Sequence, residues 1–158
     1  MTERQRQFME AAIELARKGM NSNTGGPFGC VIVKDDLIIG RGCNSVSTLN
    51  DPTAHAEVVA IRDACMHLKN FQLEGCEVYT TCEPCPMCMG AIYWARPSKV
   101  YYAATRSDAA AAGFDDSLIY RELTQPIGQR QIEMINIERE KSVGLFSEWN
   151  DKPDKVAY

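Results

Sequence analysis

The chain has 158 residues, of which 45% are hydrophobic and 24% are charged, values ordinary for one water-soluble globular domain. The formal net charge of −4 argues against a face that binds duplex nucleic acid, because such a face must be basic. No apolar run approaches the roughly 20 residues of a membrane span. Residues 1–7 also lack the apolar stretch of a signal peptide, so we expect a cytoplasmic protein with no membrane contact.

The first half of the chain predicts a helix, a β-hairpin and a second helix. Apolar residues recur at helical spacing over residues 3–20. Two short apolar runs, residues 30–33 and 37–39, flank a pair of aspartates and predict a hairpin. A polar loop follows, and residues 54–68 then show the wide apolar face of a helix.

A strand, a helix and a strand are predicted next, over residues 77–81, 86–95 and 99–104. This order predicts an α/β fold, a three-layer α/β/α arrangement with a mixed central β-sheet. The strand–helix–strand crossovers should be parallel and right-handed. We expect residues 1–158 to form a single domain whose core spans residues 5–120.

The pattern is weaker after residue 120. Residues 117–123 indicate a short helix, residues 132–137 alternate like a strand, and residues 143–150 indicate a last helix. The final segment contains apolar residues separated by charged ones. They are too few to form a core of their own and too many for a solvent-exposed tail. Something must cover them, either the chain's own sheet or a second subunit.

Two short stretches have the composition of a catalytic metal site: TAHAE at residues 53–57 and CEPCPMC at residues 82–88. His55, Cys85 and Cys88 would supply three ligands to zinc, which leaves its fourth position open, as in catalytic sites. Glu57 stands two residues after the histidine, in the H-x-E…P-C-x-x-C pattern of the zinc nucleobase deaminases. In that pattern the glutamate is an acid/base group and does not bind the metal.

Both stretches also suit helix starts. Cys85 and Cys88 are three residues apart, so their sulfurs fall on one face of a helix. The prolines at positions 84 and 86 suit a first turn, where a missing N–H costs nothing. Before the histidine, Asp51 or Thr53 is a candidate N-cap, and Pro52 fits the first turn.

The other cysteines admit a structural interpretation. Cys82 is evenly spaced with the cysteines at 85 and 88 and offers a fourth ligand for a structural zinc knuckle. That interpretation leaves the H-x-E motif unexplained, so Cys82 is better interpreted as a buried thiol near the site. Seven cysteines in all, an odd number with metal ligands among them, fit a reducing compartment. His67 lies at the far end of its helix and is not expected to be a ligand.

The metal motif resembles that of the cytidine-deaminase-like superfamily, which implies its fold over residues 5–120. Further segments resemble bacterial guanine deaminases: DPT at residues 51–53, AIYWARP at 91–97, SDAAAAGFDDS at 107–117 and the aromatic C-terminus. Zinc deaminases of tRNA adenosine or of a cytosine-type pyrimidine remain alternatives, although the acidic composition disfavours the tRNA substrate. A non-catalytic zinc protein is a further alternative, against which the intact Glu57 argues.

The resemblance implies hydrolysis of guanine to xanthine and ammonia, with zinc-activated water attacking C2 and Glu57 carrying the protons. Guanine presents N1–H and its 2-amino group side by side, and a carboxylate accepts both. Asp115 or Asp116 fits this role, although two aspartates here also suit a turn, and the resemblance favours Asp116. Phe28 and Phe114 suit either stacking on a purine or the protein core, and Asn44 suits either a bond to the purine edge or a loop cap. The candidate substrate contacts are Phe28, Asn44, Ala56, Phe114, Asp116 and Tyr158.

The resemblance also implies a homodimer in which the C-terminal segments, residues 121–158, are exchanged between the subunits. An exchanged segment would place Tyr158 over the partner's pocket. Residues 151–155, which include a proline and four charged residues, would form the crossing linker.

Overall fold

The computed structural model describes residues 1–157, which form two compact units, Met1–Ser117 and the segment from Leu118 onward. The first unit holds the sheet and its covering helices, in chain order: α1 Glu3–Asn21, β1 Gly29–Lys34, β2 Leu37–Cys43, α2 Val46–Leu49, α3 Ala56–Leu68, β3 Glu77–Cys82, α4 Pro86–Ala95, β4 Lys99–Ala104 and α5 Arg106–Ala111. The remaining elements are α6 Ser117–Thr124, the 3₁₀ turn η1 Ile127–Gln129 and α7 Arg139–Asp151.

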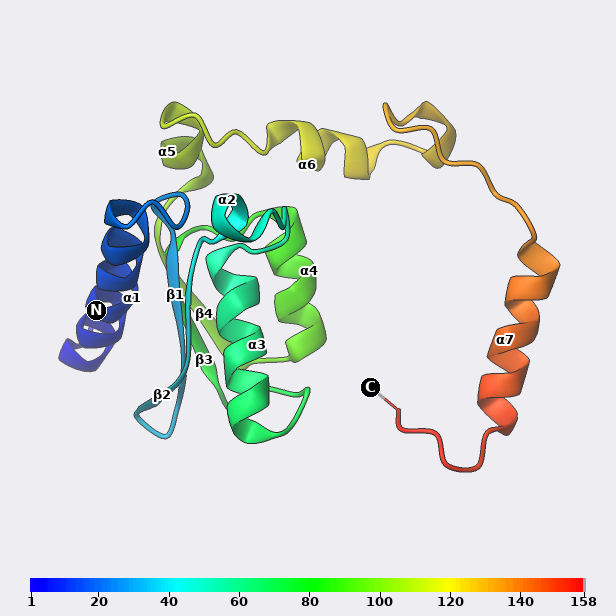
Figure 1. Cartoon of the computed structure of the whole chain (residues 1–158), viewed down its shortest axis with the longest axis horizontal. Coiled ribbons are helices and arrows are strands. Elements are labelled where there is room, and N and C mark those ends of the chain that lie inside the picture. The colour runs from blue at the N-terminus through cyan, green and yellow to red at the C-terminus, as the bar shows by residue number, and fades with distance from the viewer. Residues whose placement is uncertain (158) are drawn as a thin grey trace. The chain divides into compact units, whose positions relative to one another are not determined.

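The four strands form one mixed sheet in the order β2-β1-β3-β4. β1 is antiparallel to both β2 and β3, whereas β3 and β4 are parallel. Helix α1 covers one face, and α3 and α4 cover the other (Figure 1). The predicted three-layer α/β/α fold with a mixed sheet is therefore confirmed. The crossover through α4 joins β3 to its parallel neighbour β4. The crossover through α3 joins β2 to β3, and β1 lies between these two strands.

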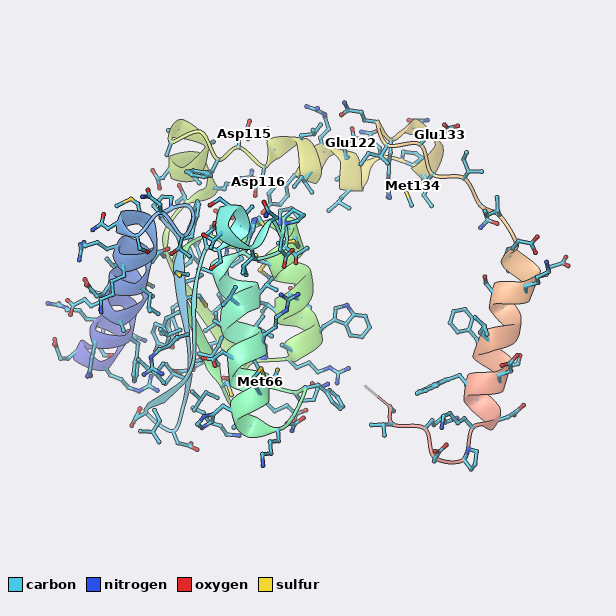
Figure 2. All side chains as sticks on the ribbon, in the orientation of Figure 1. Met66, Asp115, Asp116, Glu122, Glu133 and Met134 are labelled. Carbon is cyan, nitrogen blue, oxygen red and sulfur yellow. The ribbon has the colours of Figure 1, made fainter. Side chains whose placement is uncertain are left out.

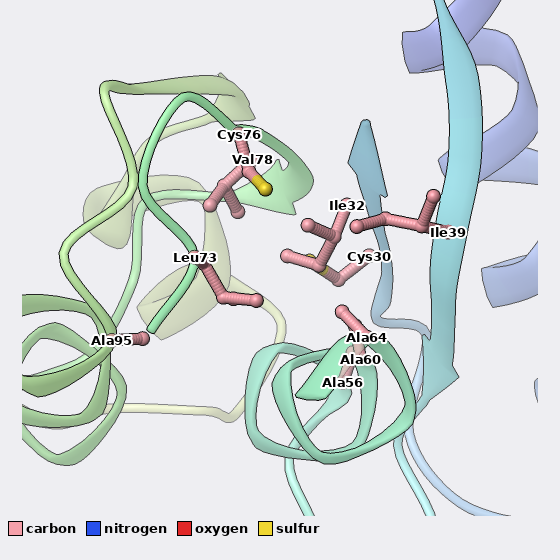
Figure 3. Close-up of a cluster of buried hydrophobic side chains, with 10 residues drawn as sticks. All are labelled: Cys30, Ile32, Ile39, Ala56, Ala60, Ala64, Leu73, Cys76, Val78 and Ala95. Atoms are coloured by element: carbon pink, nitrogen blue, oxygen red, sulfur yellow. The ribbon is translucent and has the colours of Figure 1, made fainter. Parts of the chain in front are cut away.

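Strand β1 is buried on both faces because its side chains alternate between the two helical layers. Cys30 and Ile32 pack against α3, whereas Val31 and Val33 pack against α1. On the α3 side, the small side chains Ala56, Ala60 and Ala64 face the sheet, as Figure 3 shows. They recur every fourth residue and therefore lie on one stripe of the helix.

The alanine stripe brings α3 unusually close to β2. A Cβ atom added to Gly42 would lie 2.1 Å from the carbonyl oxygen of Ala56. Contact at that distance requires glycine on the strand. The first turn of α3 is thus fixed against the end of β2, and this contact positions the residue that precedes the helix, His55.

In the second unit, none of the described residues 118–157 is buried. Helix α6 confirms the short helix predicted over residues 117–123, and α7 begins earlier than the predicted 143–150. The strand predicted over residues 132–137 is wrong, since no regular element spans it. Alternation alone does not make a strand, because the backbone N–H and C=O groups need a neighbouring strand to pair with. Helices α2 and α5 and the turn η1 were not predicted.

Within the described residues 1–157, no helix combines the length and apolar character needed to cross a membrane. All seven cysteines are free thiols.

Candidate active site

The candidate site lies at one end of the strands, where β3 ends and where α3 and α4 both begin (Figure 1). His55 is the N-cap of α3 and Cys85 is the N-cap of α4, with Pro86 as the first residue of that helix. Cys88 lies one turn further along and is fully buried. Both helix N-termini therefore point the positive ends of their dipoles at the same place, which favours anionic ligands such as thiolates.

The three predicted ligands lie together. Nδ1 of His55 is 3.6 Å from Sγ of Cys85 and 3.6 Å from Sγ of Cys88, and all three atoms lie within 4.8 Å of one another. In tetrahedral zinc sites, with Zn–S of about 2.3 Å and Zn–N of about 2.0 Å, sulfur and nitrogen are separated by roughly 3.5 Å. The donor set and its spacing therefore fit zinc.

Two thiols and an imidazole converge at this point, and their proximity shifts the pKa of each group. The pKa of Cys85 is lowered to about 4, mainly because the Cys88 thiol donates to it and also because of His55. The pKa of Cys88 is raised, by its bond to Cys85 and by burial. The pKa of His55 is raised chiefly by its hydrogen bond with Cys85. A cation at this position would replace these protons and hold both sulfurs as thiolates.

Glu57 lies in the first turn of α3 and is only 6% exposed. Its Oε1 accepts a 2.9 Å hydrogen bond from Oγ1 of Thr80 in β3, and its Oε2 lies 3.4 Å from Sγ of Cys88. Burial raises the pKa of this carboxyl above that of an exposed glutamate. A buried carboxyl of raised pKa beside the ligand group has the properties of a general acid–base residue.

Two predicted substrate contacts, Phe28 and Asn44, flank the same end of the strands. Gly29 pairs with Cys43 at the open end of the hairpin, and the backbone N–H of Asn44 donates to the carbonyl of Phe28 at 3.0 Å. The side-chain Oδ1 of Asn44 accepts the N–H of Gly26 at 3.1 Å. The amide oxygen is thus bound to the protein, which leaves Nδ2 as the group that Asn44 can present to a ligand.

The segment between α5 and α6 carries Phe114 and both aspartates. Figure 2 labels the two aspartates. The rings of Phe28 and Phe114 make an edge-to-face contact with centroids 4.9 Å apart, which ties this segment to the same end of the strands. Asp115 forms a turn: its carboxylate accepts the backbone N–H of Ser117 at 2.9 Å and the Ser117 hydroxyl at 3.0 Å. Asp116 is half-buried, and its pKa is raised by burial and then by the Cys85 charge.

A family model described as the cytidine and deoxycytidylate deaminase zinc-binding region matches residues 2–104. The chain belongs to this family of zinc-binding deaminases. Zinc is accordingly its metal, and the candidate ligands in this deaminase are His55, Cys85 and Cys88.

Individual relatives resemble the deaminase over different lengths. It is 53% identical over 151 residues to the guanine deaminase of Bacillus subtilis (strain 168), a match that covers 96% of this chain and 97% of the relative. The X-ray structure of the Bacillus subtilis enzyme matches with a TM-score of 0.95 and 51% identity, over 100% of this chain and 99% of that one. The tRNA-specific adenosine deaminase of Aquifex aeolicus is 44% identical over 97 residues, covering 61% of this chain and 64% of the relative.

The start of α3 in this deaminase differs from the start that the sequence predicts. Neither Asp51 nor Thr53 caps that helix, because His55 occupies the N-cap position. Asp51 instead accepts the N–H and the hydroxyl of Thr53, at 2.8 and 2.7 Å, and shapes the turn that precedes the histidine. Pro52 therefore lies in this turn and outside the helix.

Cys82 and His67 both lie outside the ligand group that the described residues form. Cys82 is buried at the end of β3, where its thiol contacts the carbonyl oxygen of Thr105 at 3.6 Å. His67 occupies the last turn of α3, at the opposite end of the helix from His55.

Sequence reasoning missed Thr80. β3 alternates, so Val78 and Thr80 share the face that packs on α3, and a polar side chain at such a position requires a buried partner. That signal was available in the sequence. Among the remaining predicted contacts, Ala56 is fully buried at the start of α3, and Tyr158 lies outside the described residues.

Proposed function

We propose that this deaminase hydrolyses guanine to xanthine and ammonia. The proposal is supported chiefly by the group formed by His55, Cys85, Cys88 and the buried Glu57. The near full-length similarity to a guanine deaminase supports the choice of base. The reaction balances as guanine plus water giving xanthine plus ammonia.

In the proposed reaction, bound zinc would lower the pKa of a water molecule so that it is a nucleophile near neutral pH. Glu57 accepts the water proton on Oε2, the carboxylate oxygen that faces Cys88. It delivers that proton to the ring nitrogen beside C2. It then takes the second proton from the new hydroxyl group on C2 and passes it to the amino group, which leaves as ammonia. In this proposal the backbone N–H of Cys85, the N-cap of α4, would bind the oxygen that develops negative charge.

The direct test is ammonia release by the purified, zinc-loaded protein. Guanine should be turned over, and adenine, cytosine and a tRNA anticodon stem should not. A chelator should abolish the release, and added zinc should restore it. If guanine remained unchanged while another substrate of this panel released ammonia, the guanine proposal would be wrong and that other base would be the substrate.

A tRNA adenosine substrate is the second candidate, on the strength of the identity to the Aquifex aeolicus relative. A net charge of −4 gives little general attraction for an RNA backbone. A pyrimidine substrate has no such relative among those described above. The substrate panel separates all three.

We propose that Asp116 reads the guanine edge and that Asp115 holds the turn. Asp116→Asn replaces a pure acceptor with an amide, so one N–H of the variant faces a guanine donor. Such a mismatched buried pairing costs roughly 1–3 kcal/mol, so kcat/KM for guanine should fall about 5- to 150-fold. The matched control is Asp115→Asn, which keeps an acceptor for the Ser117 N–H and should retain activity. If the two variants behave in the opposite way, the assignments are reversed.

We further propose a homodimer in which the segment from residue 121 onward is exchanged. Exposed side chains support this: Ile132 is 80% exposed and Ile137 is 76% exposed, among several large apolar residues of the segment. β4 lies at the edge of the sheet, where an unpaired strand can accept another.

A mixed-dimer experiment tests the exchange. Deletion of residues 153–158 should preserve zinc content and fold but lower guanine turnover, because the partner's site loses its cover. Coexpression of this truncated chain with a Glu57→Gln chain should restore activity, since the intact core receives the tail of the other subunit. Tails that pack on their own subunit predict no restoration. A full-length chain that is monomeric by light scattering, or a fully active truncated chain, would contradict the proposal.

We also propose a cytoplasmic location, which is supported by seven cysteines that form no disulfide with one another.

A further inference from the structure

The feature that carries this inference is the hydrogen bond between Thr80 and Glu57. The Thr80 side chain is 1% exposed, and its hydroxyl donates to Oε1 of Glu57 at 2.9 Å. The bond joins the middle of β3 to the first turn of α3, through two residues that are 23 positions apart in sequence. Both partners are held by regular structure, so the bond fixes the direction in which the carboxylate points.

The second oxygen of Glu57 has different surroundings. Oε2 lies 3.4 Å from Sγ of Cys88, which is a candidate metal ligand. When its sulfur binds the metal, Cys88 has no proton to donate to Oε2. In that state the Thr80 hydroxyl is the side-chain donor that keeps Glu57 in place, on the oxygen away from the ligand group.

We propose that Thr80 is a positioning residue that reserves Oε1 of Glu57 and leaves Oε2 as the oxygen that moves protons. Without the hydroxyl, the carboxylate can rotate away from the substrate and exchange its two oxygens. The bond therefore acts on the chemical step and leaves substrate binding unchanged. This inference rests on the proposed deaminase function.

Thr80→Val tests the inference, since valine matches threonine in shape and removes only the hydroxyl. We expect kcat for guanine to fall about 10- to 100-fold, with KM within about threefold of the original, because a bond to a charged group is lost. Thr80→Ser keeps the hydroxyl and should retain most of the activity. Zinc content should be unchanged in both, and a crystal structure of Thr80→Val should show the Glu57 carboxylate rotated.

The matched control is Thr81→Val, one residue along the same strand. The hydroxyl of Thr81 accepts the backbone N–H of Gly29 at 3.1 Å, so its loss should affect stability more than kcat. A kcat of Thr80→Val within twofold of the original would overturn the inference, as would a Thr80→Ser variant equally impaired or a Thr80→Val variant that loses zinc. An original chain that does not deaminate guanine would instead overturn the proposed function.

Discussion

Glu57→Gln is expected to lower guanine turnover by about 10⁴-fold while the protein keeps its zinc and its fold. Single general acid–base groups contribute typically ~10²–10⁴-fold, and this one would serve several proton transfers in each turnover. Glutamine matches the shape of glutamate, and its amide oxygen still accepts the hydroxyl of Thr80. The change therefore removes proton transfer and little else.

The melting temperature of metal-free Glu57→Gln separates catalysis from structure. Burial raises the pKa of Glu57, so the folded protein binds its proton more tightly than the unfolded chain does. The ionised carboxylate consequently costs stability at neutral pH, and glutamine removes that cost. We expect an equal or higher melting temperature together with lost activity. Activity within tenfold of the original, with zinc retained, would show that Glu57 is not the proton carrier.

The residues of the metal site could be predicted because they fall in two short motifs of chemically specific composition. A histidine, a glutamate two residues later and a C-x-x-C pair behind a proline favour one kind of site. The structure places the three candidate ligand atoms within 4.8 Å of one another. The partners of Glu57 were harder to predict, because Thr80 meets it only when β3 and α3 pack together.

The choice between Asp115 and Asp116 shows the same limit. Adjacent aspartates are equivalent by composition, and only the backbone of the turn distinguishes them. Asp115 accepts the two hydrogen bonds from Ser117 that form the turn. Asp116 makes neither of these bonds and is half-buried. The same argument explains the wrong strand at residues 132–137: a strand requires a partner, and period-two alternation does not specify where that partner is.

Cys85→Ser and Cys88→Ser are each expected to abolish zinc binding and activity, whereas Cys82→Ser should keep both. A serine hydroxyl is a much weaker zinc ligand than a thiolate, and a site with three protein ligands has no spare donor. Cys82 is the matched control because it is buried at the end of β3, three residues before Cys85, yet its thiol contacts Thr105 and lies outside the ligand group. Elemental analysis of the three purified variants gives the result directly.

The same variants should differ in stability, because zinc binds the folded chain and stabilises it by linkage. Adding a chelator should lower the melting temperature of the original protein and of Cys82→Ser. It should not affect Cys85→Ser or Cys88→Ser, which have no zinc to lose. If Cys82→Ser lost its metal as fully as Cys85→Ser, zinc would be held by four protein ligands. A site closed in that way has no position for water, and the proposed hydrolysis would lose its nucleophile.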